Sequence, residues 1–320
     1  MFASYLTPNR AAGPETLSEQ KPTLKLEQVT KRFGDFTAVD GLSLSVRPGR
    51  IFGLIGPNGA GKTTTIRMIV GITAPDEGSV ELFGEPAGPR AQNRIGYLPE
   101  ERGLYKKMRV GEQLRFFGEL KGMSARGADA AADRWLERLK LGDRKSSKTE
   151  TLSKGMQQKA QFAATVMHEP DLLVLDELFS GLDPVNVELM KEVVLELKAA
   201  GRAIIFSTHM MEHAEKLCDD ICLINRSRKV LSGTLREVKS GFGRDAVALR
   251  AEGAEGVLAD PALVRSVRGG ADFSEVVLAG GADAQQLLRR LLDAGARVSK
   301  FERIEPSLHD IFIEKVGEGA

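Results

Sequence analysis

Residues 56–63 read Gly56-Pro57-Asn58-Gly59-Ala60-Gly61-Lys62-Thr63 and match the pattern G-x-x-x-x-G-K-[S/T] at every position. The preceding run Ile51–Ile55 is short and apolar, as a buried strand is, and Thr63–Ile69 has helical spacing. Between a strand and a helix, the backbone N–H groups of such a loop form a nest for phosphate. The order therefore predicts an ATP phosphate site that includes Thr64, with Lys62 on the outer phosphates and Thr63 on Mg²⁺.

A second pattern, Leu172-Leu173-Val174-Leu175-Asp176-Glu177, places two carboxylates at the end of an apolar run. The carboxyl ends of parallel strands share one sheet edge, so these carboxylates are expected beside the glycine loop. There Asp176 would hold Mg²⁺, and Glu177 would polarise the attacking water as general base. Taken alone, the pattern fits an acidic turn equally well; next to the glycine loop, the catalytic interpretation is favoured.

Three further patterns are weaker when each is taken alone. A serine and a glycine precede the helical run Met156–Met167, and Ser153 fits a helix N-cap that leaves free N–H groups for an anion. A loop aspartate and a histidine after a buried strand could contact a γ-phosphate, although ordinary turns would explain both. The three patterns are Leu152-Ser153-Lys154-Gly155-Met156, Ser180-Gly181-Leu182-Asp183 and Ser207-Thr208-His209.

Bulk properties set limits on the class of protein. The chain has 320 residues, enough for two domains, and a net charge of +1, which gives no electrostatic argument for binding nucleic acid. Two cysteines in a chain of this length exclude a disulfide scaffold and favour a reducing compartment. No apolar run reaches the roughly 18 residues that a membrane helix needs, so any membrane span must come from another chain.

The chain divides into three parts by composition and periodicity. Residues 1–22 are rich in Pro, Gly, Ser and Thr and are expected to form a disordered leader. Residues 23–235 alternate strands and helices, which predicts an α/β domain with a largely parallel sheet and a helical insertion at about 104–165. The pattern breaks around Leu235–Arg244, and residues 236–320 predict a small α+β domain. Predicted strands are Thr23–Val29, Ala38–Val46, Ala203–Ser207, Ala246–Arg250, Ser274–Leu278 and Arg297–Arg303; predicted helices are Glu112–Lys121, Ala128–Leu141, Val187–Ala199, Met210–Leu217, Ala284–Asp293 and Ser307–Val316.

Taken together, the five patterns resemble those of the ATP-binding cassette (ABC) ATPases, over roughly Leu24 to Gly233. The resemblance implies a P-loop NTPase fold: a RecA-like parallel core, an antiparallel β part and a helical insertion. It implies that two cassettes pair head to tail around two Mg-ATP, with Ser153 and Gly155 of one serving the site of the other. Phe33 matches the position whose ring stacks on adenine, with a core phenylalanine as the alternative. His209 would serve catalysis, and Asp183 would lie across the dimer interface.

The sequence departs from the family pattern at three places. Glu100 stands where a glutamine is usual; a glutamate could still bind Mg²⁺ but adds negative charge near phosphate and, when ionised, donates no hydrogen bond. That glutamine also connects to the membrane partner. Lys154 and Met156 replace the commonest signature residues, and Leu178 replaces the usual proline, for which only a mild effect on the rigidity of its loop is expected. The runs 97–105 and 306–312 resemble bacterial export-type cassettes of the sodium-extrusion and drug-resistance kind.

Three functions remain to be compared. The first is the ATPase subunit of an ABC transporter, a homodimer or heterodimer of cassettes that drives a separate transmembrane permease, cytoplasmic and peripheral on the inner membrane face. The second is a non-transport ABC ATPase acting on nucleic acid or ribosomes; such proteins usually carry two cassettes or a long coiled coil, and neither is present here. The third, a phosphotransferase, would need a visible acceptor site. The first is favoured, with no nucleic-acid partner expected.

Overall fold

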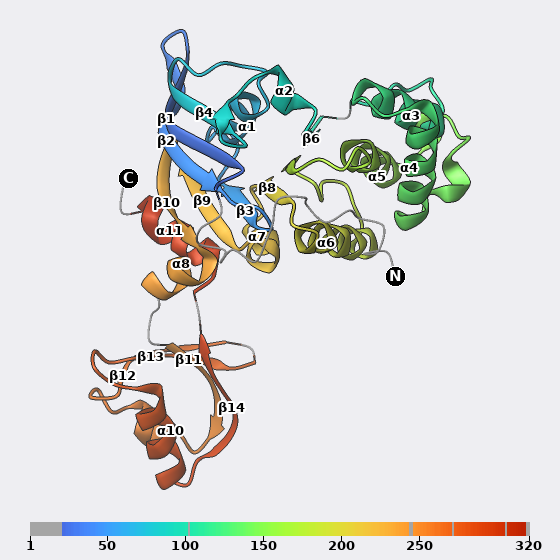
Figure 1. Cartoon of the computed structure of the whole chain (residues 1–320). Helices are drawn as coiled ribbons and strands as arrows, with labels where there is room; N and C mark the ends of the chain where they lie inside the picture. Colours follow the sequence, from blue (N-terminus) through green and yellow to red (C-terminus); the bar gives the residue numbers. More distant parts are fainter. Residues whose placement is uncertain (1–20, 102, 243–245, 271, 305, 318–320) are drawn as a thin grey trace. The chain divides into compact units, whose positions relative to one another are not determined.

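The computed structural model describes residues 21–101, 103–242, 246–270, 272–304 and 306–317. The chain divides into two compact units, with the boundary between Thr234 and Leu235 (Figure 1). Of the leader predicted at residues 1–22, only the last two residues fall within the described part.

A six-stranded sheet forms the centre of the first unit, in the order β10-β9-β3-β8-β7-β6. Neighbours from β6 to β9 run parallel, and β10 runs antiparallel to β9. Every residue of β3, β7 and β8 is buried, which explains why their sequences are unbroken apolar runs. The bounds are β3 (Ile51–Ile55), β6 (Ile95–Leu98), β7 (Leu172–Asp176), β8 (Ala203–Thr208), β9 (Asp220–Asn225) and β10 (Arg228–Thr234).

An antiparallel sheet, in the order β2-β1-β4-β5, shares a hydrophobic core with the central sheet. Its strands are β1 (Leu24–Phe33), β2 (Phe36–Val46), β4 (Glu77–Leu82) and β5 (Glu85–Pro86). The prediction ended β1 at Val29 because apolar alternation stops there. In the structure β1 continues to Phe33, where ion pairs with the β4 region replace apolar burial: Lys31 with Asp76, and Arg32 with Glu77, both at 2.7 Å.

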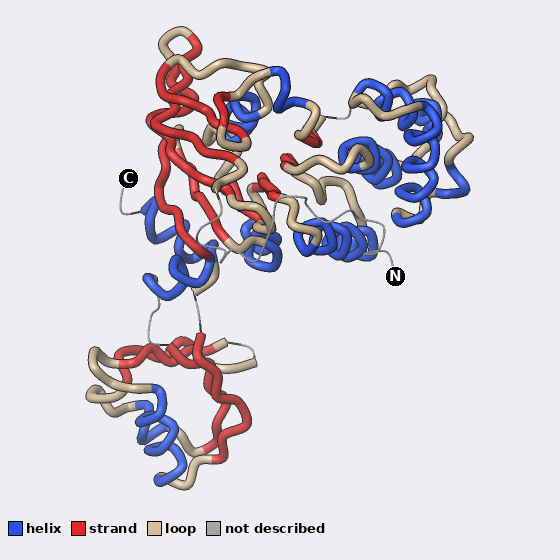
Figure 2. The backbone as a smooth tube through the Cα atoms, viewed as in Figure 1, coloured by secondary structure: helices blue, strands red, loops and turns tan. Residues whose placement is uncertain are grey.

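The predicted helical insertion consists of α3, α4 and α5, which pack on one another beside the central sheet (Figures 1 and 2). Trp135 of α4 meets Phe162 of α5 edge-on, with ring centroids 6.4 Å apart. Single 3₁₀ turns at Gly142–Arg144 and Thr149–Thr151 connect α4 to α5. The helices of the first unit are α1 (Lys62–Ile69), α2 (Pro89–Gln92), α3 (Val110–Leu120), α4 (Ala125–Arg138), α5 (Lys154–Val166), α6 (Pro184–Ala199) and α7 (Met211–Leu217).

The helices α3, α4, α5 and α6 begin two or three residues before their predicted starts, and in the last three a capping side chain sets the first turn. Ser124 accepts a hydrogen bond from Gly127 N, Ser153 from Met156 N, and Asp183 from Asn186 N. The predicted end of α4 at Leu141 is also wrong. Lys140 adopts a φ of 56°, and this left-handed conformation ends the helix.

The second unit has a four-stranded antiparallel sheet in the order β12-β13-β11-β14, built from a β-α-β-β-α-β chain order. Leu287 and Leu291 of α10 pack on one face of this sheet, in a core of their own with Val247, Leu249 and Val276. The bounds are α8 (Leu235–Gly241), β11 (Ala246–Glu252), α9 (Glu255–Leu258), β12 (Val264–Gly269), β13 (Ser274–Leu278), α10 (Ala284–Asp293), β14 (Arg297–Ile304) and α11 (Leu308–Gly317).

The helix α5 lies against β6 because position 96 has no side chain. A Cβ added at Gly96 would sit 2.4 Å from the carbonyl oxygen of Thr165, a backbone atom of α5. We expect Gly96→Ala to lower the free energy of unfolding by about 2 kcal/mol, since a packed core cannot absorb the extra methyl group without moving the helix.

Chemical unfolding followed by circular dichroism measures this loss. Gly103→Ala is the matched control, because a Cβ there meets no atom within 4 Å. If both variants are as stable as the unaltered chain, the close packing of α5 on β6 is wrong.

Candidate active site at the carboxyl edge of the central sheet

The glycine loop follows β3 and leads directly into α1, as the sequence predicts. A Cβ at Gly61 would lie 2.4 Å from Ala38 O, and φ at Gly61 is 109°, so only glycine fits. Gly61 also stands at the N-cap of α1, where it supplies no capping side chain. The first N–H groups of the helix therefore have no side-chain acceptor, as an anion site requires. Thr63 and Thr64 are half-buried in this first turn.

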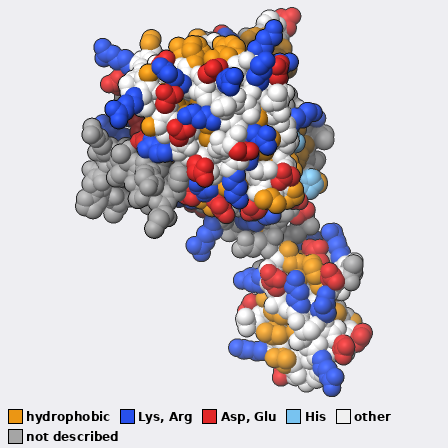
Figure 3. All heavy atoms as spheres, turned by 90° about the vertical axis from the view of Figure 1, so that its right-hand side faces the viewer, with side chains coloured by type: hydrophobic (Ala, Val, Ile, Leu, Met, Phe, Trp, Pro, Cys, Tyr) orange, Lys and Arg blue, Asp and Glu red, His pale blue; other side chains and the backbone are white. Residues whose placement is uncertain are grey.

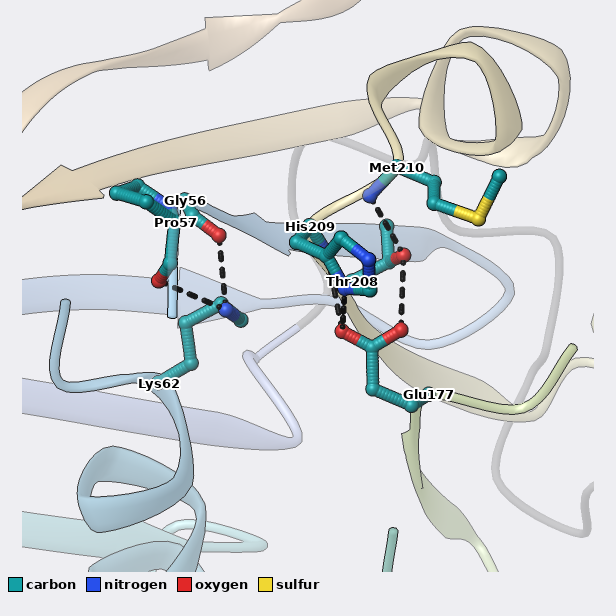
Figure 4. A network of polar contacts seen from close by, with 7 residues as sticks. All are labelled: Gly56, Pro57, Lys62, Glu177, Thr208, His209 and Met210. Atoms are coloured by element: carbon teal, nitrogen blue, oxygen red, sulfur yellow. Dashed lines mark hydrogen bonds and ion pairs between the residues drawn. The ribbon is translucent and has the colours of Figure 1, made fainter. Parts of the chain in front are cut away.

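Lys62 is enclosed by its own loop. The side chain is buried, and Nζ donates hydrogen bonds to the carbonyl oxygens of Gly56 at 2.8 Å and Pro57 at 3.1 Å (Figure 4). Burial lowers the pKa of the Lys62 ammonium, and the negative charges of Glu177, Asp176 and Glu100 oppose that shift. The cation and three carboxylates thus lie within electrostatic range of one another.

Asp176 is the last residue of β7 and is almost fully buried. Its Oδ2 accepts no hydrogen bond from the described residues, and burial raises the pKa of this carboxyl. A buried carboxylate oxygen with no partner is costly unless a cation is bound to it. Oxygen ligands are what Mg²⁺ prefers, so the carboxylate of Asp176 fits such an ion, and the hydroxyl of Thr63, in the first turn of α1, is the same kind of ligand.

Glu177 has φ of 48°, which is uncommon for a residue with a side chain. Its carboxylate is mostly buried and accepts hydrogen bonds from the backbone N of His209 at 3.0 Å and from Thr208 Oγ1 at 3.3 Å. The ring Nδ1 of His209 lies 2.7 Å from Glu177 Oε1 (Figure 4). Because Nδ1 faces the carboxylate, Nε2 is the ring nitrogen left to meet a phosphate. The role of Thr208 was not predicted, because a hydroxyl residue between a serine and a histidine gives no distinctive signal.

Glu100 belongs to the same edge of the sheet. Leu98, the last residue of β6, pairs with Leu175 of β7, so Glu100 lies two residues past the edge on which Asp176 stands. Its side chain is exposed, and its charge acts on both Lys62 and Asp176.

Phe33 ends β1 and is 52% exposed, with Lys31 Nζ 5.7 Å from its ring centre. This exposure contradicts the alternative that Phe33 is a core residue. An exposed ring is available for stacking.

The signature residues lie on a different part of the unit. Ser153 is exposed at the N-cap of α5, and Gly155 lies in its first turn, near the backbone of Gly181. Figure 1 places α5 beside α3 and α4, whereas α1 lies against β2. Asp183 caps α6 and accepts two hydrogen bonds from Asn186, which lower the pKa of its carboxyl. One chain therefore brings the glycine loop, Asp176, Glu177, Glu100 and His209 to one sheet edge. Ser153 and Gly155 stand at the start of α5, where Gly155 lies near Gly181 in the loop that follows Glu177.

Each of the two units matches a family of known proteins. Residues 39–180 match the family described as ABC transporter, and residues 233–316 match the C-terminal domain of DrrA1-3-like ATP-binding proteins. An ABC transporter ATP-binding protein of Bacillus subtilis, YhaQ, is 48% identical over 294 residues, which cover 92% of this chain and 98% of that protein.

Two further relatives cover mainly the first unit. The Nod factor export ATP-binding protein I of Burkholderia lata is 42% identical over 70% of this chain and 75% of its own length. A solved ATP-binding subunit of an ABC transporter superposes with a TM-score of 0.65 at 31% identity, covering 69% of this chain and 93% of that one. The chain therefore belongs to the ABC transporter family, as one of its ATP-binding and ATP-hydrolysing subunits.

Proposed function

We propose that this subunit pairs with a second cassette around two Mg-ATP and uses hydrolysis to drive a separate transmembrane permease in export. One observation carries the proposal: Lys62, Asp176, Glu177 and His209 share one sheet edge, while Ser153 is exposed at the start of α5, a helix that Figure 1 places beside α3 and α4 and not beside α1. A complete site then needs the Ser153 of another copy.

Each residue at the sheet edge has a distinct task in this proposal. The glycine loop and Lys62 bind the phosphates, Phe33 stacks on adenine, and Thr63 and Asp176 hold Mg²⁺ with Glu100 beside them. When bound, Mg²⁺ neutralises phosphate charge. Glu177 accepts a proton from the attacking water as general base, and His209 directs Nε2 at the γ-phosphate. The hydrogen bonds from Thr208 and the His209 backbone hold the Glu177 carboxylate in place.

The second cassette would supply the anion site at the start of α5. Ser153 already accepts the N–H of Met156, and the remaining N–H groups of the first turn favour an anion through the helix dipole. Asp183 is exposed and adjacent in the fold, since Gly155 approaches Gly181. The face formed by Ser153, Gly155 and Asp183 is thus a candidate for the cassette interface.

The permease has a candidate docking site close to Glu100. A largely apolar hollow of about 330 Å³ lies between the segment after β6 and the helices α3 and α5. Leu120, which lines it, is 63% exposed, and Tyr105, which is 53% exposed, stacks its ring on the lining residue Phe117 with centroids 6.1 Å apart. Exposed aromatic clusters of this kind mark protein contacts. We assign the hollow to an apolar segment of the permease.

Location and direction follow from the same proposal. A bilayer crossing would need a longer and more apolar helix than any among the described residues. We place the subunit on the cytoplasmic membrane face, bound to its permease. The export assignment draws on the resemblance of the 97–105 run and on the Burkholderia lata relative, which is named for Nod factor export.

A nucleic-acid partner is the alternative. Figure 3 shows Lys and Arg side chains interspersed with Asp and Glu on the face it presents, and net charge is +1. Mixed charges do not favour a polyanion. Binding of DNA or RNA that weakens steeply with salt would support the alternative instead.

Lys62→Ala is expected to reduce ATP turnover at least 100-fold, because the phosphates lose their buried cation. Phosphate release measures turnover. The control is Lys198→Ala, which removes an ion pair with Asp219 away from the site. Normal turnover in Lys62→Ala would refute the assignment of the phosphate loop.

Glu177→Gln is expected to bind ATP and to stall as a dimer, because the amide cannot take a proton from water. Gel filtration with Mg-ATP should show a dimer that the unaltered chain does not accumulate. Glu119→Gln on the exposed face of α3 serves as the control. If Glu177→Gln hydrolyses ATP at the normal rate, another group is the base.

Ser153→Arg is expected to abolish turnover while ATP binding to the same chain persists, since the phosphate loop is untouched. Ser146→Arg, at an exposed serine of the same insertion, should change neither. Equilibrium binding of a fluorescent ATP analogue separates the two effects. Turnover that survives Ser153→Arg would argue against any contact between the signature and ATP.

A further inference from the structure

A buried glutamine connects the signature helix to the residue next to Glu177. Gln158, in α5, is 2% exposed, and its Nε2 donates a hydrogen bond of 3.1 Å to the carbonyl oxygen of Leu178. We propose that Gln158 is a positioning residue for Glu177: it holds the Glu177–Leu178 backbone in the conformation that hydrolysis requires. This inference rests on the proposed role of Glu177 as base.

The backbone at Glu177 needs such support. A φ of 48° is unfavourable for a residue with a side chain and persists only where neighbours enforce it. From the β8 side, Glu177 N donates to Ser207 O at 3.0 Å. On the other side stands Leu178, which has no ring to fix its own φ as a proline would. The Gln158 hydrogen bond anchors the chain at that second side.

The enforcement comes from α5 as a whole. The loop after Glu177 follows the helix along its first turns: Gly155 faces Gly181, with 3.5 Å from a Cβ position to its carbonyl oxygen, and the charge of Asp183 acts on Lys159. Lys159 is itself buried. Gln158 lies between Gly155 and Lys159 in the helix and bonds Leu178 directly, so a displacement of the helix start would be transmitted to Leu178.

The consequence concerns communication between the two sites. Ser153, five residues before Gln158 in the chain, is proposed to meet the ATP of the second cassette. If α5 moves toward that ATP, the hydrogen bond from Gln158 to Leu178 would shift the carboxylate of Glu177 in the same chain. ATP bound at one site would thereby change the position of the general base, Glu177, in the other site.

The test compares Gln158→Met with Gln113→Met in the full chain. Gln113 is a matched control: it is also 2% exposed, its Nε2 donates to Thr149 Oγ1 at 3.1 Å and its Oε1 accepts from the backbone N of Tyr105, and neither partner belongs to the loop that follows Glu177. We expect Gln158→Met to lower kcat roughly tenfold with KM for ATP and binding of a fluorescent ATP analogue unchanged, because only the placement of the base is lost. Gln113→Met should keep kcat even if its melting temperature falls equally.

A second readout separates positioning from general damage. Gln158→Met should accumulate an Mg-ATP dimer on gel filtration, as a cassette with a misplaced base would, and Gln113→Met should not. Gln158→Asn keeps the amide but is one methylene shorter, so it should show the same loss of kcat if Gln158→Met proves too unstable to measure.

Equal kcat in the Gln158 and Gln113 variants, with Glu177→Gln inactive, would overturn the inference and leave the proposed function intact. Normal turnover in Glu177→Gln would instead refute the role of the base itself, whatever the Gln158 variants do.

Discussion

The parallel register of β3, β7 and β8 is the constraint on which the site depends. Ile55 pairs with Thr208, and Asp176 pairs with Ser207. This register ends all three strands at one level, so the chain leaves the sheet there as the glycine loop, as Glu177 and as His209. Backbone hydrogen bonds between buried strands therefore set the distances between groups that are more than 100 residues apart. Any slip of register would separate the phosphate loop from the carboxylates.

Burial gives the groups at this edge their chemical character. As whole residues, Lys62, Asp176 and Glu177 are at most 8% exposed, and a buried charge is stable only when it is paired or hydrogen-bonded. Lys62 is satisfied by carbonyl oxygens and Glu177 by Thr208 and His209. One carboxylate oxygen of Asp176 accepts no hydrogen bond within the described part of the chain, and this is the feature that fits a metal ion. The sheet edge therefore offers a buried ammonium group that suits a phosphate and a buried carboxylate that suits a cation.

The sequence predicts the buried strands and the motifs at their ends well, because a strand covered on both faces must be an unbroken apolar run. The prediction of strands fails where ion pairs or pairing with a neighbouring strand, and not apolar burial, hold the backbone. The second half of β1 is held by ion pairs from Lys31 and Arg32, and exposed β12 consists largely of polar residues. At Leu235–Arg244 a break was expected; α8 occupies Leu235–Gly241, and residues 243–245 lie outside the described part.

The sequence predicts which residues belong to the site better than it predicts the hydrogen bonds that they make. The hydrogen bond from Gln158 to Leu178 joins residues 20 apart, and a buried glutamine in a helix carries no mark of its partner. Glu100 could be placed near Mg²⁺ only through the resemblance, whereas the pairing of β6 with β7 puts it at the edge beside Asp176.

The central claim is that one chain holds half of each ATP site. Mixing two inactive chains, one with Lys62→Ala and one with Ser153→Arg, tests it directly. If sites are shared, the mixed dimer contains one intact site: the loop of the Ser153→Arg chain and the signature of the Lys62→Ala chain. ATP turnover should then reappear on mixing. A mixture as inactive as its two components would show that each cassette uses its own signature, and would contradict the account.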